Sequence, residues 1–267
     1  MRFLRGIAAA GAAALALSIA PSATAAPTQL LATSYPVTGS FGDLWRSSGA
    51  ENGFLRQPTS GEVPIRGGVF QNFQGGTLYW TPTTGAHSVS GDFLRFYAGQ
   101  GYENGFLGYP LTQEVPIRNG VFQVFQGGVL YWSPDVGAHS VSGSFRELYG
   151  QFGYENGELG YPRSQELRSR AGGVYQQYQG GVMYWSPEEA ESGPHVVRSA
   201  ILIEYGQAGW ENGCLGYPLT SQYSYEGYST VQEFQGGMIW APPGEEPFVD
   251  LWPDESGYRM SGLYPRC

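Results

Sequence analysis

One segment recurs four times along the chain. It runs from Gly67 to Trp80 and returns at 119–132, 172–185 and, more loosely, 229–240. The tripeptide Glu-Asn-Gly precedes each copy, with spacings of 52, 52 and 56 residues between Glu51, Glu103, Glu155 and Glu211. A period of this length indicates one supersecondary unit copied in tandem, in which each copy buries its apolar face on its neighbours. We therefore expect four similar units, whereas an enzyme needs one asymmetric site.

Each repeat contains the pattern of a short amphipathic helix. In the second copy, Phe93, Phe96 and Tyr97 are spaced i, i+3 and i+4 within residues 89–100. This spacing places the three side chains on one face of a helix of two to three turns. So short a helix does not persist alone, and we expect it to be held by packing.

A β-hairpin is predicted after the helix. In the second copy, strand-like runs at 121–126 and 129–133 flank Gly127-Gly128, a strong signal for a two-residue turn. A turn at this glycine pair would place Gln123 opposite Trp132. Because side chains alternate between faces, one face then carries Val121, Gln123, Phe125, Leu130 and Trp132. We interpret this mostly apolar face as the core side.

The opposite face of the hairpin carries Phe122, Val124, Gln126, Val129 and Tyr131. Its middle position holds Asn72, Val124, Gln177 and Glu233 in the four copies. A position that accepts a charge does not lie in a dry core. The fourth copy lacks one residue after its Gly236-Gly237 pair, so strict alternation moves Trp240 to this face, where the other copies have Tyr79, Tyr131 and Tyr184.

The N-terminus has the pattern of a secretory signal peptide. Arg2 and Arg5 precede an apolar run at 6–20, and Ala23-Thr24-Ala25 is a small-residue cleavage pattern. A membrane anchor is the alternative, but the run is shorter than the roughly 20 residues that span a bilayer. We expect residues 1–26 to be removed and the mature chain to be secreted without membrane insertion.

The charge of the chain argues against polyanionic partners. Without Arg2 and Arg5, twelve arginines and no lysine face 23 acidic residues, a net charge of −11. An acidic chain without a basic patch is unsuited to nucleic acid or to an anionic membrane surface.

The chain has two cysteines, Cys214 and the last residue, Cys267. In a secreted protein two cysteines suggest one disulfide. That bridge would tie the C-terminal tail to the fourth repeat and stabilise the fold by roughly 4 kcal/mol in the chain-entropy model. Two free thiols are the alternative.

A tetrapeptide in three of the copies carries a family resemblance. Leu-Gly-Tyr-Pro at 107–110, 159–162 and 215–218 resembles the LGFP repeat, with Tyr in place of Phe. The Gln-Gly-Gly hairpin and the Tyr-Trp-Ser-Pro ending fit as well, and the resemblance covers about residues 35–243. The first copy departs from it, with Leu55-Arg56-Gln57-Pro58.

The resemblance implies a location and a partner. LGFP repeats occur in secreted proteins of actinobacteria with a mycolic-acid envelope. The family is thought to bind the cell wall through its arabinogalactan, and its repeats are thought to pack around a pseudo-symmetry axis. No catalytic domain accompanies the four repeats here.

The recurring histidines and glutamates could form metal or catalytic sites, or they could have structural roles. His87, His139 and His195 recur once per repeat and could meet at an axis, but no local cluster of ligands supports a metal site. No Gly-x-Ser-x-Gly elbow is present. The repeated glutamates could supply the two carboxylates of a glycosidase, but periodic carboxylates more often hold loops. We expect no enzyme activity, no metal and no cofactor.

The outer hairpin face supplies the predicted ligand site. An exposed aromatic ring suits the C–H face of a sugar, and nearby amides can bind hydroxyls. The alternative is that this face packs against the adjacent repeat. The predicted residues are Tyr79, Tyr131, Tyr184, Trp240, Gln74, Gln126, Gln179 and Gln235.

These observations predict an α+β fold of four tandem repeats of about 52 residues, each a short helix plus a β-hairpin, arranged like a propeller around a pseudo-symmetry axis. The expected repeats are 35–87, 88–139, 140–195 and 196–243, within a domain at 27–243, followed by a tail at 244–267. The predicted function is non-catalytic binding of an envelope polysaccharide by a secreted, envelope-associated monomer. An envelope scaffold that binds protein is the alternative, and a glycan- or ester-hydrolysing enzyme is less favoured.

Overall fold

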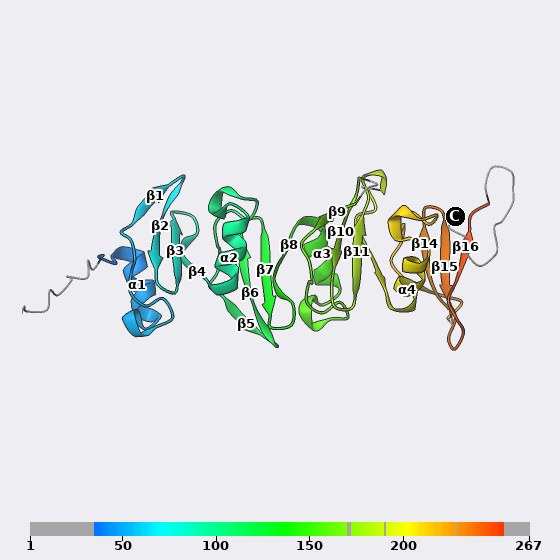
Figure 1. Cartoon of the computed structure of the whole chain (residues 1–267), viewed down its shortest axis with the longest axis horizontal. Helices are drawn as coiled ribbons and strands as arrows, with labels where there is room; N and C mark the ends of the chain where they lie inside the picture. Colours follow the sequence, from blue (N-terminus) through cyan, green and yellow to red (C-terminus); the bar gives the residue numbers. More distant parts are fainter. Residues whose placement is uncertain (1–34, 170–171, 190, 228, 254–267) are drawn as a thin grey trace, which may run out of the picture. The chain divides into compact units, whose positions relative to one another are not determined.

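The computed structural model describes residues 35–169, 172–189, 191–227 and 229–253. The predicted signal peptide and Cys267 lie outside these residues. Within them, each repeat contains one α-helix, a 3₁₀ turn after it and a four-stranded antiparallel sheet (Figure 1). The α+β repeat fold is therefore confirmed, whereas the propeller-like arrangement around an axis stays a prediction.

The four repeats have the same order of elements. The first comprises α1 (Gly39–Ser47), η1 (Ala50–Asn52), β1 (Val63–Ile65), β2 (Gly68–Phe73), β3 (Gly76–Thr81) and β4 (Gly85–Ser90). The second comprises α2 (Gly91–Gly99), η2 (Tyr102–Asn104), β5 (Val115–Ile117), β6 (Gly120–Phe125), β7 (Gly128–Ser133) and β8 (Gly137–Val141). The third comprises α3 (Gly143–Gln151), η3 (Tyr154–Asn156), β9 (Leu167–Arg168), β10 (Val174–Gln177), β11 (Gly181–Trp185), η4 (Pro187–Glu189) and β12 (His195–Arg198). The fourth comprises α4 (Ser199–Gln207), η5 (Trp210–Asn212), β13 (Tyr223–Tyr225), β14 (Ser229–Phe234), β15 (Gly237–Ala241) and β16 (Phe248–Leu251).

The predicted hairpin is the inner pair of each sheet. In the second repeat β6 and β7 pair with each other, β5 adds on one side and β8 on the other. β5 is formed by the segment just before the predicted hairpin. β8 consists of the residues that enter the next helix. The strand β16 lies inside the predicted C-terminal tail and completes the fourth sheet.

The predicted register of the hairpin is wrong by two residues. Gln123 pairs with Leu130, not with Trp132, and Trp132 pairs with Val121. The turn therefore consists of Gln126 and Gly127. Gly127 is required by a close approach: a Cβ there would lie 1.9 Å from the carbonyl oxygen of Phe106. A slip of two residues preserves side-chain alternation, so the assignment of side chains to the two faces holds.

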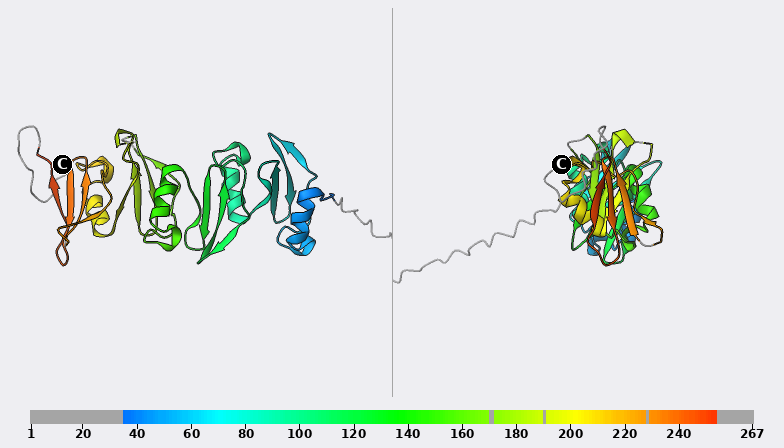
Figure 2. Two further views of the ribbon diagram at one scale, coloured as in Figure 1. Left: turned by 180° about the vertical axis from the view of Figure 1, so that it is seen from behind. Right: turned by 90° about the vertical axis from the view of Figure 1, so that its right-hand side faces the viewer.

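Each helix after the first packs between two sheets. The helix α2 contacts β3 and β4 of the first repeat and β7 and β8 of its own, and Figure 2 shows it beside the sheet of its own repeat. One core cluster accordingly joins Tyr79 of the first sheet, Phe93 and Tyr97 of α2, and Leu130 of the second sheet. Both faces of the first three sheets are therefore covered, which is the alternative that the sequence left open.

One glutamine lies at the centre of each sheet and is fully buried: Gln71, Gln123, Gln176 and Gln232. The side-chain Nε2 of Gln123 donates to the carbonyl oxygens of Ser88 (2.7 Å) and Thr112 (2.8 Å). The amide therefore joins the strand that enters the helix to the link before the hairpin. In the third repeat Tyr178 donates its hydroxyl to Gln176 Oε1 (2.9 Å), whereas Oε1 of the other three glutamines has no partner among the described residues.

The fourth sheet has the predicted shift at Trp240. Trp240 pairs with Val231, which corresponds to the pairing of Tyr131 with Phe122 in the second repeat. Trp240 therefore stands where the other sheets have tyrosine. No helix follows this sheet among the described residues, and Trp240 is partly exposed beside Tyr225 and Phe248.

Candidate functional site

A pocket of about 750 Å³ lies at the junction between the first and second repeats. Its first wall is the outer face of the first sheet, including Phe70, Asn72 and Tyr79, together with Gln74 at the hairpin turn. Its second wall comes from the next repeat, through α2 and the 3₁₀ turn with Tyr102 and Glu103. The pocket therefore exists only where two repeats meet.

An exposed aromatic residue stands at the edge of this pocket. Tyr102 has φ of 56°, a left-handed backbone conformation that is uncommon for a bulky residue. Its side chain is 44 % exposed, although its ring lies edge-on against the buried ring of Tyr97 at 5.9 Å. Backbone strain of this kind costs about 1–3 kcal/mol and persists where the surroundings impose it, often at ligand sites.

The same feature recurs at each later junction. Tyr154 (φ 55°) and Trp210 (φ 57°) are equally exposed and lie edge-on against the buried Tyr149 and Tyr205. The first repeat has Ala50 at this position, also with positive φ. The backbone conformation is thus common to all four repeats, whereas the aromatic side chain is present only where another sheet precedes the helix.

A carboxylate accompanies each exposed ring. Glu103 follows Tyr102 and accepts a hydrogen bond from Asn104 Nδ2 (2.7 Å). At the third junction the equivalent Glu211 also accepts from Ser169 Oγ of the preceding repeat (2.6 Å). Burial, and secondly the charge of Glu103, raise the pKa of the Tyr79 hydroxyl above its usual range. The wall therefore offers an un-ionised tyrosine hydroxyl beside the carboxylate of Glu103.

The tyrosine of the Leu-Gly-Tyr-Pro motif forms a hydrogen bond across the junction. In Leu-Gly-Tyr-Pro, the hydroxyl of Tyr109 donates to the carbonyl oxygen of Arg66 in the preceding repeat (2.6 Å), and Tyr161 does the same to Arg118 (2.6 Å). The first repeat has Gln57 here and no preceding repeat to reach. This accounts for its departure from the motif.

Three of the four predicted aromatic platforms are buried. Tyr79, Tyr131 and Tyr184 are at most 5 % exposed, because each packs edge-on against a tyrosine of the following helix at about 5.4–5.5 Å. The expectation that these rings are exposed is wrong. Of the predicted set, only Trp240 has a partly exposed ring.

The predicted glutamines hold the Leu-Gly-Tyr-Pro turns. Gln126 Oε1 accepts the backbone N–H of Tyr109 (2.9 Å), and Gln179 and Gln235 accept from Tyr161 and Tyr217 in the same way. Gly108 has φ of 62°, and a Cβ there would lie 2.5 Å from Gln126 Oε1. The glutamine oxygen therefore has a structural role. Of the predicted residues, Gln74 and Tyr79 both line the pocket between the first and second repeats.

Tyr102, Tyr154 and Trp210 are missing from the predicted ligand site because they precede Glu-Asn-Gly and lie outside the predicted hairpin. The signal was present in the comparison of copies, since three have an aromatic residue and the first has Ala50. That difference becomes informative only when the position is known to face a preceding sheet.

The histidines occupy structural positions. The Nε2 atoms of His87 and His139 lie 2.8 and 2.9 Å from the carbonyl oxygens of Thr84 and Val136. Burial lowers the pKa of His139 and of His195. Among the residues that the structure describes, no group of three or more His, Cys, Asp or Glu side chains could hold a metal ion.

A single carboxylate lines the first pocket within the described residues, that of Glu103. Glycoside hydrolysis uses a pair of carboxylates across the scissile bond. The arrangement of an exposed ring, a buried phenol, an amide and one carboxylate is instead suited to binding hydroxyl groups and an apolar ring face.

No curated protein matches the chain. A solved structure, the extracellular domain of the one-component system BT4673 from B. thetaiotaomicron, is similar with a TM-score of 0.18 at 14 % identity. The match covers 74 % of this chain but only 23 % of that protein, and its TM-score is too low to support an inference.

Within the described part of the chain, no helix is long and apolar enough to cross a membrane. The profile of the LGFP repeat matches three times, over residues 56–105, 107–157 and 159–213. These matches cover more than half of the sequence and have the period of the structural repeats, and each runs from the sheet of one repeat to the helix and 3₁₀ turn of the next. The chain belongs to the LGFP repeat family.

Proposed function

We propose that this chain is a secreted, non-catalytic protein that binds a polysaccharide of the bacterial cell envelope, such as arabinogalactan, in the grooves between its repeats. The single observation that carries the proposal is the exposed aromatic residue at each junction. Tyr102, Tyr154 and Trp210 are held in a strained backbone conformation and are 42–45 % exposed. The first repeat, before which no sheet lies among the described residues, has Ala50 instead.

The chemistry of the first groove supports a sugar ligand. Tyr102 offers a flat face to the C–H groups of a sugar ring. Glu103, Asn72 and the hydroxyl of Tyr79 can bind hydroxyl groups directionally. No lysine is available to attract a polyanion, and the chain is acidic. A neutral polyol therefore fits this groove better than a phosphate-rich ligand does.

Repetition supports a polymer over a small molecule. The exposed aromatic residues recur at three junctions of one chain and could bind successive segments of one polysaccharide, with each additional contact gaining from the effective concentration that the first creates. Weak single contacts then give firm retention on a wall.

The alternative function is an envelope scaffold that binds protein. Phe54 and Phe106 are 50 % exposed outside the first groove and are the observation that favours it, and Phe54 lines a separate pocket of about 350 Å³. The exposed aromatic residues at the junctions favour the first proposal because they occur only in repeats that follow another sheet. Phe54, by contrast, lies in the first repeat.

Sedimentation with purified cell walls tests the proposal. We expect the mature protein to be retained at high salt and to be released by soluble arabinan or galactan. The triple variant Tyr102→Ala, Tyr154→Ala, Trp210→Ala should lose retention, whereas the double variant Phe54→Ala, Phe106→Ala serves as a matched control and should keep it. Loss in the control alone, with a protein recovered from the wall, would favour the scaffold.

A further inference from the structure

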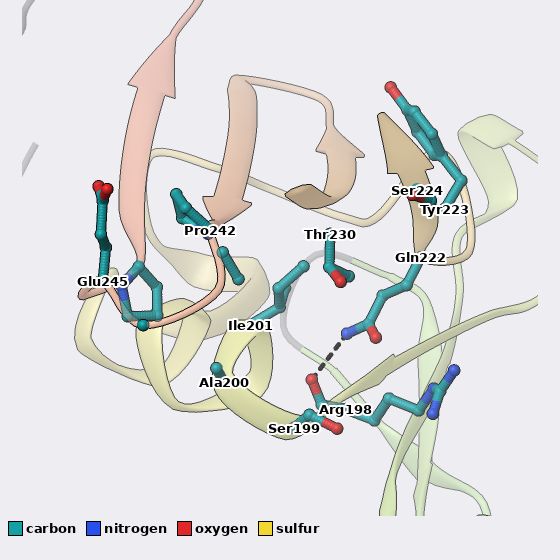
Figure 3. A pocket seen from close by; sticks show the side chains of 13 residues that line it. Arg198, Ser199, Ala200, Ile201, Gln222, Tyr223, Ser224, Thr230, Pro242 and Glu245 are labelled. Carbon is teal, nitrogen blue, oxygen red and sulfur yellow. Dashed lines mark hydrogen bonds between the residues drawn. The ribbon is translucent and has the colours of Figure 1, made fainter. Parts of the chain in front are cut away.

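The fourth repeat contains a pocket of about 530 Å³ between the start of α4 and its sheet (Figure 3). Its walls include Ala200 and Ile201 of α4, Gln222 before β13, Thr230 of β14 and Ala241 of β15. This pocket faces the core side of the sheet, opposite to the face that carries Trp240. It is thus separate from the grooves between repeats.

The pocket occupies the place of an indole. In the second repeat Trp132 pairs with Val121, and its Nε1 donates to Asp92 Oδ2 of α2 (2.6 Å). The equivalent pair in the fourth repeat is Ala241 with Thr230. The residue lost after the hairpin turn has moved the tryptophan, now Trp240, to the other face.

A further substitution at the start of α4 enlarges the space. Ala200 occupies the helix position of Asp92, which binds the indole in the second repeat, and Ile201 occupies that of Phe93. The first three repeats have phenylalanine and tryptophan where the fourth has Ile201 and Ala241, so two large side chains are replaced by smaller ones around a single cavity. Tight packing is the rule in protein interiors, and two losses at one place point to an occupant from outside the chain.

The lining is half apolar and half polar. Ile201, Ala200 and Ala241 form an apolar surface, and Figure 3 shows Ile201 and Thr230 turned toward one another with the amide of Gln222 close by. Gln222 Nε2 donates to the carbonyl oxygen of Arg198 (2.7 Å), which fixes the amide and leaves its Oε1 as an acceptor.

Charge at the pocket is nearly balanced. Arg198 lines one side, but its guanidinium forms an ion pair with Glu158 of the third repeat. Glu245 supplies a carboxylate on the rim. A phosphate or carboxylate ligand would gain little from a neutralised arginine, and a purely apolar ring would leave the hydroxyl and amide unpaired.

We propose that this pocket binds one sugar ring of the envelope polysaccharide, with an apolar ring face on Ile201 and Ala241 and with hydroxyl groups on Thr230, Gln222 and Glu245. A sugar ring is similar in size to the indole that it replaces. The inference rests on the proposed function and deepens it: the grooves bind the length of the polymer, whereas this pocket recognises a single terminal or branching unit.

The test uses the whole mature protein, labelled at isoleucine methyl groups, with methyl arabinofuranoside and methyl galactoside as probes. We expect a saturable NMR shift at Ile201. Ala241→Trp, which restores the missing indole, should abolish the shift. Thr230→Val, which replaces the hydroxyl of an exposed residue by a methyl group, should weaken binding about 10-fold. The triple groove variant should leave the shift at Ile201 unchanged.

The outcomes separate this inference from the proposed function. Absence of any shift at Ile201 while wall retention is intact would overturn the inference alone. A shift that persists in Ala241→Trp, or one caused by indole but not by either sugar, would overturn it as well. Loss of both wall retention and the shift in the unmodified protein would overturn both proposals.

Discussion

The first repeat and the three later repeats have the same fold but differ wherever a preceding sheet is present. The first has Ala50, Gln57 and Trp45 where the second has Tyr102, Tyr109 and Tyr97. In the second repeat Tyr102 lines the groove and Tyr109 donates a hydrogen bond to the preceding repeat. Tyr97 packs in the core between the two sheets. The difference shows that these aromatic residues belong to the junctions and not to the repeat itself.

The largest expected effect is alkaline unfolding through the junctions. Burial is the main cause that raises the pKa of the tyrosines in the junction clusters, whereas the cluster around α1 contains no tyrosine. A raised folded-state pKa gives stability that is intact below pH 10 and is lost as the pH rises, by about 1.4 kcal/mol per tyrosine per pH unit. The tyrosines concerned are Tyr79, Tyr97, Tyr131, Tyr149, Tyr178, Tyr184 and Tyr205.

Tyrosinate absorbance and far-UV circular dichroism along one pH series measure this effect. We expect cooperative ionisation that coincides with unfolding above pH 10. Tyr149→Phe should release one proton fewer in the transition. Gradual ionisation near pH 10 with the circular dichroism unchanged would show that the junctions are open to solvent.

A matched pair of truncations compares the two regions directly. Tyr149 is fully buried between two sheets and donates its hydroxyl to the carbonyl oxygen of Gly160 (2.7 Å), whereas the equivalent Trp45 of α1 is partly exposed. Tyr149→Ala should lower the free energy of unfolding by about 3–5 kcal/mol. Trp45→Ala should cost less than half as much. Equal losses in urea unfolding would contradict the distinction.

Much of the repeat could be predicted from its sequence. Period, helix position and the two hairpin faces follow from spacing and alternation, and the displaced Trp240 follows from one missing residue. The register was missed because the turn consists of Gln126 and Gly127, whereas Gly128 of the glycine pair already belongs to the strand and pairs with Phe125. The burial of Tyr79 was missed because alternation assigns a face without showing what covers it, and the cover comes from α2 of the next repeat.

A smaller effect on stability is expected inside the repeats, and it should be the same in the first repeat as in the second. Tyr178 donates to the buried Gln176 Oε1, whereas Phe73 and Phe125 leave the equivalent oxygens of Gln71 and Gln123 without a partner among the described residues. Phe73→Tyr and Phe125→Tyr should each stabilise by about 1 kcal/mol in chemical denaturation. A gain at Phe125 alone would mean that the first repeat differs internally as well.

The predicted bridge between Cys214 and Cys267 remains open to test, since Cys267 lies outside the described residues. Peptide mapping of the non-reduced mature protein should recover the two cysteines in one linked fragment. Cys267→Ser should then lower the free energy of unfolding by roughly 2–4 kcal/mol. Recovery of the two cysteines in unlinked fragments would contradict the bridge.

The central claim is that glycan binding resides at the junctions, and calorimetric titration with a soluble fragment of the wall polysaccharide tests it most directly. Tyr102→Ala, Tyr154→Ala and Trp210→Ala should each weaken binding by about 5- to 10-fold, the loss of roughly 1 kcal/mol for one ring contact. Ala50→Tyr, which adds the same ring where no sheet precedes the helix, should leave the affinity unchanged. Unchanged affinity in all three alanine variants, or a gain from Ala50→Tyr equal to their loss, would contradict the account.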